Sequence, residues 1–214
     1  MESSPLKTSE VYRTGRPAVS FELFPPKTDE GMNSLFAHLR ELALCKPAFI
    51  TCTYGAGGST RDRTLEVLKR VRENYPAIPL GSHLTCVGAG QDDLRAYIRQ
   101  AMDIGVDRIV ALRGDPPRGE NTFRPAENGF SYADELVRLL RSEFPELGVI
   151  VGGYPETHPE APSMAKDLEN LKRKVDAGAD AVVTQLFFEN QDYFRFRDKC
   201  LAMGITVPIV PGIL

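Results

Sequence analysis

Short apolar runs alternate with amphipathic stretches along most of this chain, at intervals of roughly thirty residues. Each apolar run has the length of a buried strand, and each stretch that follows has the apolar spacing of a helix. A strand, a helix and another strand in this order make a crossover unit, and right-handed crossovers place their strands parallel in one sheet. The repeat therefore predicts an α/β fold with an all-parallel sheet, either doubly wound or closed into a barrel.

Seven apolar runs have the turn-forming boundaries expected of strands. The fourth is typical, because it stops abruptly at Arg113, Gly114 and Asp115. The predicted strands are residues 18–24, 48–53, 80–85, 108–112, 149–154, 180–188 and 207–214. Helices are predicted between them, including residues 92–104 and 163–177, one capped by Ser131 that ends near residue 144, and others capped by Ser59 or Thr60 and by Asn190.

Polar residues finish nearly every predicted strand, and this favours one of the two parallel folds. An open sheet gathers its ligand residues at a single switch point, whereas a barrel collects them from the carboxyl ends of many strands. We therefore expect a (β/α)8 TIM-type barrel. A full barrel of this type takes roughly 250 residues. The 214-residue sequence reaches only the seventh strand, so the predicted barrel is incomplete, with its C-terminal units missing.

Composition indicates one globular domain that binds small molecules. Hydrophobic residues make up 42% of the chain, enough for a sizeable core, and we place a polar, frayed leader at residues 1–17 and the barrel at residues 18–214. A net charge of -3 gives no general reason to bind nucleic acid or an anionic membrane. No apolar run approaches the roughly 20 residues of a membrane span, and the leader is unlike a signal peptide, so the cytoplasm is the predicted location.

The four cysteines are interpreted as reduced thiols. They form no CxxC pair and have no other spacing typical of metal ligands. No metal site is predicted.

Two carboxylates stand out at predicted strand ends. Alternation in the first strand places Glu22 on the face that would line the barrel interior. Asp115 follows the fourth strand together with Arg113, at the end where barrel enzymes keep their chemistry. On the residues alone, a solvated Arg and Asp are an equally good interpretation of that exit, and His83 in the third strand is more simply a buried core residue.

Loops and one helix face add further candidates. A glycine-rich loop at residues 55–58 allows backbone to approach a ligand closely. It lacks the Gly-Lys-Ser/Thr ending of a P-loop, and it does not match the GxGxxG dinucleotide-binding pattern. The longest connection, residues 116–129, is typical of a lid or a binding loop. In the helix after the fifth strand, Asp167, Asn170 and Lys174 share one face, either as solvated residues or as a polar row for a ribose and phosphates.

Five short motifs, in a fixed order, carry a resemblance to a known family. They are Ser20-Phe21-Glu22-Leu23-Phe24-Pro25-Pro26-Lys27, Thr53-Tyr54-Gly55-Ala56, Ala111-Leu112-Arg113-Gly114-Asp115, Tyr154-Pro155-Glu156-Thr157-His158-Pro159 and Thr184-Gln185-Leu186-Phe187-Phe188. Together they closely resemble motifs of methylenetetrahydrofolate reductase. The resemblance implies a flavin-bearing barrel in which NADH or NADPH reduces FAD. The reduced flavin then passes a hydride to 5,10-methylenetetrahydrofolate, giving 5-methyltetrahydrofolate, a step of one-carbon metabolism and methionine biosynthesis.

The resemblance also implies roles for individual residues. Glu22 matches the general acid that protonates N10 of the folate, a task that needs a carboxyl pKa raised by desolvation. Asp115 matches the aspartate beside the flavin, whose charge would stabilise a cationic folate intermediate. Gln185 resembles the glutamine that contacts folate and nicotinamide in turn, which implies ping-pong kinetics. Thr53 is a further substrate contact.

For FAD the resemblance implies contacts drawn from most of the strand ends. These are Thr53, His83, Leu112, Arg113, Gly114, Asp115, Tyr132, Ala133, Gly152, Tyr154, His158, Asp167, Asn170 and Lys174. Gly152 stands where some relatives carry alanine, which leaves more room. The family further implies a homo-oligomer when the chain is full length, and it does not separate NADH from NADPH.

Two other hypotheses remain open. One is a flavin-free barrel lyase or isomerase that uses Glu22 and Asp115 as acid and base. The other is a non-catalytic fragment of such a barrel, whose open sheet edges would make it associate.

Overall fold

The computed structural model describes residues 8–12, 15, 17–54, 61–116, 119 and 122–214. Seven strands lie in this part of the chain. They are β1 (Ser20–Leu23), β2 (Phe49–Cys52), β3 (Leu80–Thr85), β4 (Val106–Leu112), β5 (Gly148–Gly153), β6 (Ala181–Thr184) and β7 (Ile209–Val210). Every predicted strand is confirmed, although those predicted at residues 180–188 and 207–214 extend well beyond β6 and β7.

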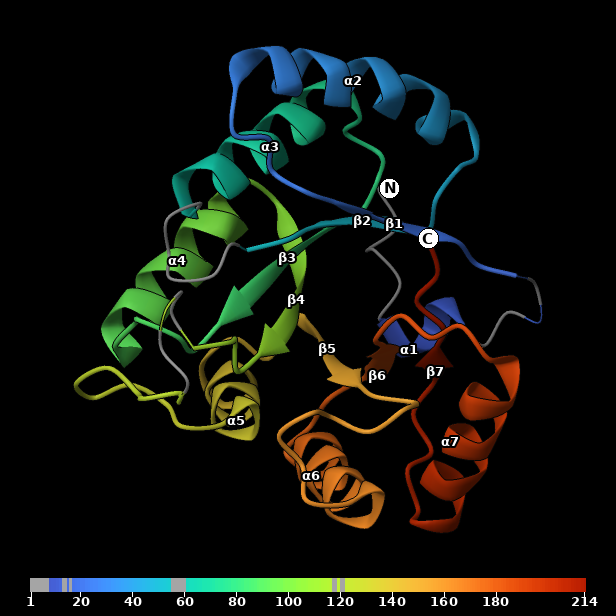
Figure 1. The fold of residues 1–214 in the computed structure, drawn as a ribbon. Coiled ribbons are helices and arrows are strands. Elements are labelled where there is room, and N and C mark those ends of the chain that lie inside the picture. The colour runs from blue at the N-terminus through green and yellow to red at the C-terminus, as the bar shows by residue number, and fades with distance from the viewer. Residues whose placement is uncertain (1–7, 13–14, 16, 55–60, 117–118, 120–121) are drawn as a thin grey trace.

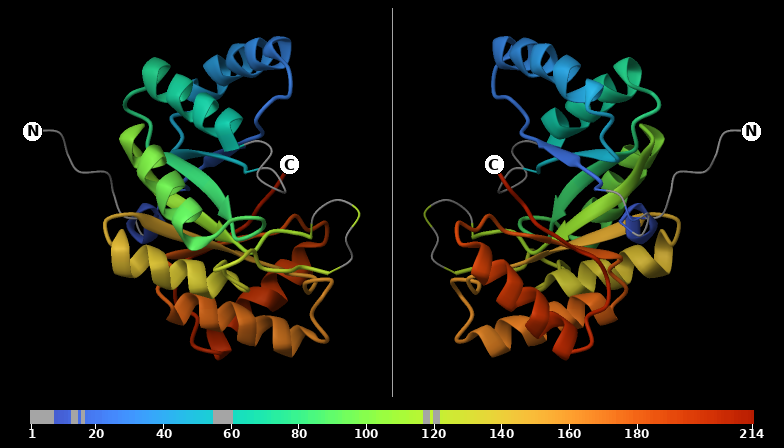
Figure 2. Two further views of the ribbon diagram at one scale, coloured as in Figure 1. Left: turned by 90° about the vertical axis from the view of Figure 1, so that its left-hand side faces the viewer. Right: turned by 90° about the vertical axis from the view of Figure 1, so that its right-hand side faces the viewer.

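All neighbouring strands pair in parallel, and the order in the sheet is the order in the sequence, from β1 to β7. A doubly wound sheet would reverse its order at a switch point, and this one does not. The sheet curls into an arc with helices on its outer side, as Figure 1 and the side views of Figure 2 show. The fold is therefore the incomplete TIM-type barrel that the strand ends predict.

The helices alternate with the strands as predicted. They are α1 (Thr8–Val11), α2 (Asp29–Leu44), α3 (Arg61–Asn74), α4 (Gln91–Asp103), α5 (Ala133–Glu143), α6 (Met164–Asp176) and α7 (Asn190–Ala202). Ser163 caps α6 by accepting a hydrogen bond from the Lys166 backbone N–H at 3.2 Å.

Two predicted caps are wrong. The cap of α5 is Tyr132 rather than Ser131, because the Glu135 carboxylate accepts hydrogen bonds from the backbone N–H groups of both residues, at 2.8 and 2.7 Å. Asn190 is the first residue of α7, and Glu189 holds the cap position. The predicted caps Ser59 and Thr60 and the glycine-rich loop 55–58 lie outside the described residues.

The sheet has a core on each face. The larger core lies between the strands and the outer helices and includes Ile50, Leu84 and Val149. The smaller core lies inside the arc, where side chains from four strands meet: Phe49, Val110, Ile150 and Ala181. Because residues alternate between the faces of a strand, the inner core fixes which side chains point into the barrel.

Part of the predicted leader closes the amino-terminal end of this interior. Residues 8–11 form α1, which packs on β5, and Thr8 is buried there at 1% exposure over Gly148. The Tyr12 ring meets the Phe49 ring edge to face at 6.4 Å. The expectation of a frayed leader is therefore wrong for these residues, because they cover apolar surface that the strands expose at this end.

Beside them lies a fully buried cation, Arg108. Its Nε donates a hydrogen bond to Asp107 Oδ1 at 2.6 Å, and its guanidinium lies over the Phe49 ring, 4.5 Å from the ring centroid. The amino-terminal end of the interior is thus packed with side chains and carries one buried ion pair.

Among the described residues, no helix combines the length and the apolar character needed to cross a lipid bilayer.

Candidate functional site

The carboxyl ends of the parallel strands meet at one edge of the sheet, and the predicted site residues gather there. Glu22 lies near the end of β1, Thr53 directly follows β2, and Gln185 directly follows β6. Asp115 lies three residues beyond β4. Parallel pairing places all four exits at the same rim, as a barrel active site requires.

Glu22 and His83 face one another inside the arc. Glu22 is opposite Thr51 in the β1–β2 register, and Thr51 is opposite Gly81, two residues before His83 on the same face of β3. The alternation that places Glu22 on the interior face is therefore confirmed. Glu22 Oε2 lies 3.3 Å from His83 Nε2.

The pKa of Glu22 differs from the expectation. Contact with the His83 imidazole lowers this pKa below its usual value, and this outweighs desolvation, which acts in the opposite direction. The physical reason is the hydrogen bond to His83, and desolvation is too weak to cancel it because the Glu22 side chain is still 43% accessible. The protein alone therefore favours an ionised Glu22.

The exit of β4 has a backbone conformation that requires glycine. Gly114 has a φ of +87°, and a Cβ there would lie 2.9 Å from Val87 Cγ1 and 3.0 Å from Thr85 Cβ. The chain therefore turns tightly after Leu112 and brings Arg113 and Asp115 to the rim. Asp115 is exposed, and its negative charge contributes to the raised pKa of Tyr154, for which burial is the largest cause.

Arg113 contacts a carboxylate and an aromatic ring at the rim. Its Nη1 and Nη2 donate to Glu160 Oε2 and Oε1 at 2.7 and 2.8 Å, a bidentate ion pair. Its guanidinium also lies 5.1 Å from the centroid of the Phe123 ring. The solvated Arg113 that the residues alone allowed is wrong, because the side chain is 21% exposed and fully engaged with neighbouring loops. Glu160 itself carried no signal in the sequence.

The exit of β5 folds over the start of α6. The Tyr154 and His158 rings pack edge to face at 4.5 Å, and the His158 backbone N–H donates to Asp167 Oδ2 at 2.9 Å. The Glu160 backbone N–H donates to His158 Nδ1 at 3.1 Å. This turn therefore ties three predicted FAD contacts to one another.

Lys174, about two helical turns beyond Asp167, reaches back to the same strand. Its Nζ donates to the Gly152 carbonyl at 2.6 Å. Burial lowers the Lys174 pKa to about 8, against the opposing effects of Asp167 and Asp134. Asn170 Oδ1 accepts from Arg173 Nη2 at 2.7 Å, an exposed contact within α6.

The remaining predicted residues occupy the rim with fewer contacts. Gln185 is exposed, and its side-chain Oε1 accepts from the backbone N–H of Leu186 at 2.9 Å. Tyr132 is 57% exposed, with the Arg173 guanidinium 5.9 Å from its ring centroid, and Ala133 begins α5. In the described part of the chain, no group of three or more His, Cys, Asp or Glu could hold a metal ion.

A known protein family matches nearly the whole chain. The family model described as methylenetetrahydrofolate reductase matches residues 7–214. The chain belongs to the methylenetetrahydrofolate reductase family. It is 46% identical over 200 residues to the 5,10-methylenetetrahydrofolate reductase of Salmonella typhimurium, covering 94% of this chain and 65% of that protein. It is 41% identical over 218 residues to methylenetetrahydrofolate reductase (NADH) 1 of Zea mays, covering 97% of this chain and 37% of that protein.

The reductase-family chain therefore spans between about a third and two thirds of the length of these curated relatives. Solved structures show the same fold at low identity. A protein from Clostridium thermocellum described as binding two copies of 5-methyl-5,6,7,8-tetrahydrofolic acid has a TM-score of 0.62 and 14% identity, over 96% of this chain and 69% of that chain. A 2,3-dimethylmalate lyase has a TM-score of 0.58 and 9% identity, over 94% of this chain and 78% of that chain.

The residues at the rim fit the flavin that the reductase family implies. In the described part of the chain, Thr85 Oγ1 is a buried polar atom at this end that lacks a hydrogen-bond partner, whereas His83 Nε2 has Glu22 Oε2 at 3.3 Å. A Cβ at Gly152 would meet only Leu112 Cδ2, at 3.5 Å, so the β5 exit leaves open space. Lys174 supplies a cation beside that space. Polar donors, a cation and room for a planar group therefore occur together.

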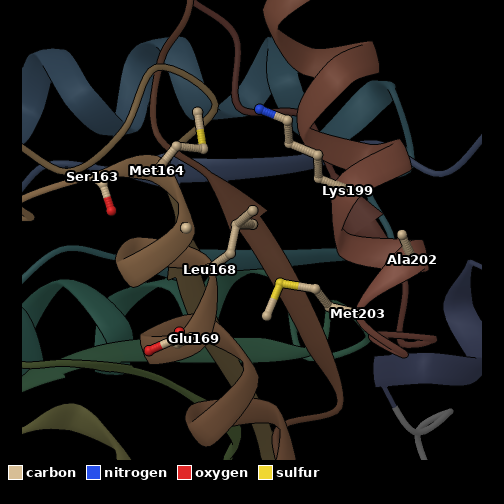
Figure 3. Close-up of a pocket in the computed structure, with 8 residues that line it drawn as sticks. Ser163, Met164, Leu168, Glu169, Lys199, Ala202 and Met203 are labelled. Atoms are coloured by element: carbon tan, nitrogen blue, oxygen red, sulfur yellow. The ribbon is translucent and has the colours of Figure 1, made fainter.

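A groove of this reductase-family chain lies between α6 and α7. It has a volume of about 530 Å³ and is lined mainly by apolar side chains, including Met164, Leu168 and Met203, with Glu169 and Lys199 also on its wall (Figure 3). None of the residues that line it is a predicted site residue. The groove is therefore separate from the row of polar residues at the rim.

Proposed function

We propose that this chain carries the catalytic site of a flavin-dependent methylenetetrahydrofolate reductase. NADH or NADPH would reduce FAD, and 5,10-methylenetetrahydrofolate would then be reduced to 5-methyltetrahydrofolate, by ping-pong kinetics. Residues 18–214 would form the flavin-binding catalytic unit. The protein would act in the cytoplasm, in one-carbon metabolism leading to methionine, and its full-length form would be a homo-oligomer.

One observation supports this proposal most strongly. Glu22, Asp115 and Gln185 come from three different strand exits, and parallel pairing brings those exits to one rim of the arc. An acid, an anion and an amide at one rim suit a substrate that must be protonated, stabilised as a cation and held by hydrogen bonds. Membership of the reductase family supports the same substrate.

Two groups of residues would hold FAD. The first is the β4 exit, where Leu112, Arg113, Gly114 and Asp115 follow one another. The second runs from Tyr154 and His158 to the row on α6: Asp167, Asn170 and Lys174. Lysine at the buried end of that row offers positive charge to a phosphate, and the carboxylate and amide can accept from or donate to hydroxyls. FAD, when bound, supplies the two-electron chemistry that side chains lack.

Glu22 would give the folate its proton at N10. A general acid needs a pKa near the working pH, whereas the His83 contact lowers the pKa of Glu22. Desolvation already acts on this carboxyl in the upward direction, so covering its 43% exposed side chain would oppose the effect of His83. In this proposal the folate itself completes the acid by excluding water from it.

Asp115 and Gln185 would orient and stabilise the substrate. Asp115 is exposed at the rim and keeps its negative charge available to a cationic folate. Gln185 presents an amide that can both donate and accept, which suits a residue that contacts folate and nicotinamide in turn. Thr53 adds a small polar contact at the β2 exit.

The test separates the two halves of the reaction. Purified protein is examined for a yellow flavin absorption band, reduced anaerobically with NADH and with NADPH in separate experiments, and then mixed with methylenetetrahydrofolate. We expect bleaching of the band by a reduced nicotinamide and its return with the folate. A protein that cannot bind FAD would contradict the proposal. So would a bound flavin that reduced nicotinamides reduce but that the folate does not reoxidise.

A further inference from the structure

Arg113 is held more firmly than any other predicted site residue of the β4 exit. Both Nη atoms contact the Glu160 carboxylate, and Nε donates to the Gly114 carbonyl at 3.2 Å. A bidentate carboxylate fixes the plane of a guanidinium as well as its position. The orientation of Arg113 is therefore set by a residue from the next loop along the sheet.

Glu160 makes a second contact, to the other group of predicted FAD residues. Its backbone N–H donates to His158 Nδ1, which requires that nitrogen to accept and leaves the ring proton on Nε2 when the imidazole is neutral. The His158 backbone N–H in turn donates to Asp167. A continuous series of contacts thus runs from Arg113 through Glu160 and His158 to Asp167.

The two groups come from separate segments of the chain. Arg113 and Glu160 are 47 residues apart in the sequence, and they lie on the β4 and β5 exits. Glu160 lies outside the set of residues that the family resemblance assigns to FAD, yet it bonds to a member of each group. Within the described ranges, no other residue outside that set forms hydrogen bonds to both Arg113 and His158.

We propose that Glu160 is a positioning residue of the flavin site, which joins the β4 exit to the β5–α6 turn and fixes Arg113 for the bound dinucleotide. This inference rests on the proposed function, because it assumes that FAD binds at this rim. Without Glu160, the Arg113 side chain regains rotamer freedom that binding must then remove, and the His158 turn loses its link to the neighbouring loop. The Glu160 side chain acts through Arg113, its backbone N–H holds His158 in every variant, and no contact with the ligand is assigned to it.

Three variants test the proposal by measuring FAD affinity. In Glu160→Gln the side chain keeps its length but loses its charge and one acceptor. In Glu160→Asp the charge remains on a shorter stem. Glu143→Gln is the matched control, because Glu143 forms a similar bidentate pair with Arg95 on the helical surface, where Arg95 Nε and Nη2 donate at 2.7 to 3.1 Å. Each apoprotein is titrated with FAD by fluorescence, and its thermal unfolding midpoint is recorded.

We expect Glu160→Gln to weaken FAD binding about tenfold, or ~1.4 kcal/mol. Glu160→Asp should restore part of the loss, and Glu143→Gln should leave FAD affinity unchanged. Glu160→Gln and Glu143→Gln should shift the unfolding midpoint by similar small amounts, because both lose a surface ion pair. The difference between them then isolates positioning from general stability.

The alternatives give different results. Tighter FAD binding by Glu160→Gln would show that the carboxylate competes with the ligand for Arg113, and equal binding would show that it does not position the site. Either result overturns the inference. If the unmodified protein fails to bind FAD, the proposed function falls first, so the two failures are distinguishable.

Discussion

The two ends of the barrel interior use their polar residues differently. At the amino-terminal end, Arg108 is 2% exposed and bonded to Asp107, and Thr8, the first residue of α1, is 1% exposed. At the carboxyl end, Glu22 is 43% exposed and Asp115 also faces solvent. One end is packed with buried side chains and the other leaves its charges accessible. The amino-terminal ends of the strands therefore lie in packed surroundings that favour stability, and the carboxyl ends of the same strands present charges that suit chemistry.

The comparison makes a direct prediction about substitutions. Changes at the carboxyl end, apart from the buried Lys174, should alter ligand binding and reaction rates while leaving the free energy of unfolding nearly unchanged. Changes at the amino-terminal end should do the reverse. The four experiments below try to break this separation, beginning with the largest expected effect.

Glu22→Gln should lower the rate of the folate half-reaction by roughly 10² to 10⁴, the usual contribution of a general acid, while sparing reduction of the flavin by NADH or NADPH. Glutamine keeps the size of the side chain but cannot give up a proton. Stopped-flow absorbance under anaerobic conditions measures each half-reaction separately. An equal loss of rate in both half-reactions would contradict the role of Glu22 as general acid. A large drop in the unfolding midpoint would show that the carboxyl end also contributes to stability.

Asp107→Ala should destabilise the protein by about 3 kcal/mol, because it leaves the buried Arg108 guanidinium without its carboxylate partner. Arg108→Met is the matched control. It removes the charge but keeps a long apolar side chain, so we expect a change within about 1 kcal/mol. Urea unfolding measures both, and FAD titration should show unchanged affinity. A loss of FAD affinity at native conditions would show that the two ends are coupled.

Lys174→Met should change the pH dependence of stability and the pH dependence of FAD affinity. The pKa of Lys174 is lowered to about 8 in the folded protein, below its ordinary 10.5. Between these values the unfolded chain binds more protons, so the folded state gains stability as pH rises through this window, by at most about 3 kcal/mol. Lys174→Met should remove that gain. The free energy of unfolding is measured against pH for the unmodified protein and for the variant, and the difference between the two curves isolates the contribution of Lys174. A difference curve without pH dependence between 8 and 10 would contradict it.

The second pH dependence is that of FAD affinity. A phosphate favours the protonated amine, so FAD affinity should fall as pH rises through about 8 in the unmodified protein. Lys174→Met should bind FAD about tenfold more weakly at pH 7 and lose this dependence. FAD titrations across the pH range measure both effects.

Thr8→Val should have the smallest effect. The Thr8 hydroxyl is buried, and in the part of the chain that the structure describes it has no hydrogen-bond partner. Valine has nearly the same shape without the polar group, so we expect a gain of about 1 kcal/mol in stability and unchanged FAD affinity. Thermal unfolding measures the gain. A loss of stability would indicate that an ordered water or another group satisfies the hydroxyl.

Alternation and strand ends predicted the fold and much of the rim. Glu22 could be placed on the interior face because side chains alternate along a strand, and Asp115 at the rim because parallel strands share their carboxyl edge. These inferences depend only on local sequence. They needed no knowledge of what each residue touches.

Contacts between distant segments could not be predicted in this way. The lowered pKa of Glu22 depends on its exposure and on His83 from another strand, and the pair of Arg113 with Glu160 joins residues 47 positions apart. The buried Thr8 illustrates the same limit, since a short polar segment gives no periodic signal of what it covers. Side-chain partners are set by tertiary packing, which a single sequence pattern does not encode.

The order of the sheet has a consequence for how the protein is made. Each strand from β2 to β7 pairs with the one immediately before it in the sequence. During synthesis on the ribosome, every newly emerged strand therefore finds its neighbour already in place, and no early strand must wait for a distant partner. Apart from the free edge of β1, the exposed pairing edge therefore always lies at the most recently translated strand.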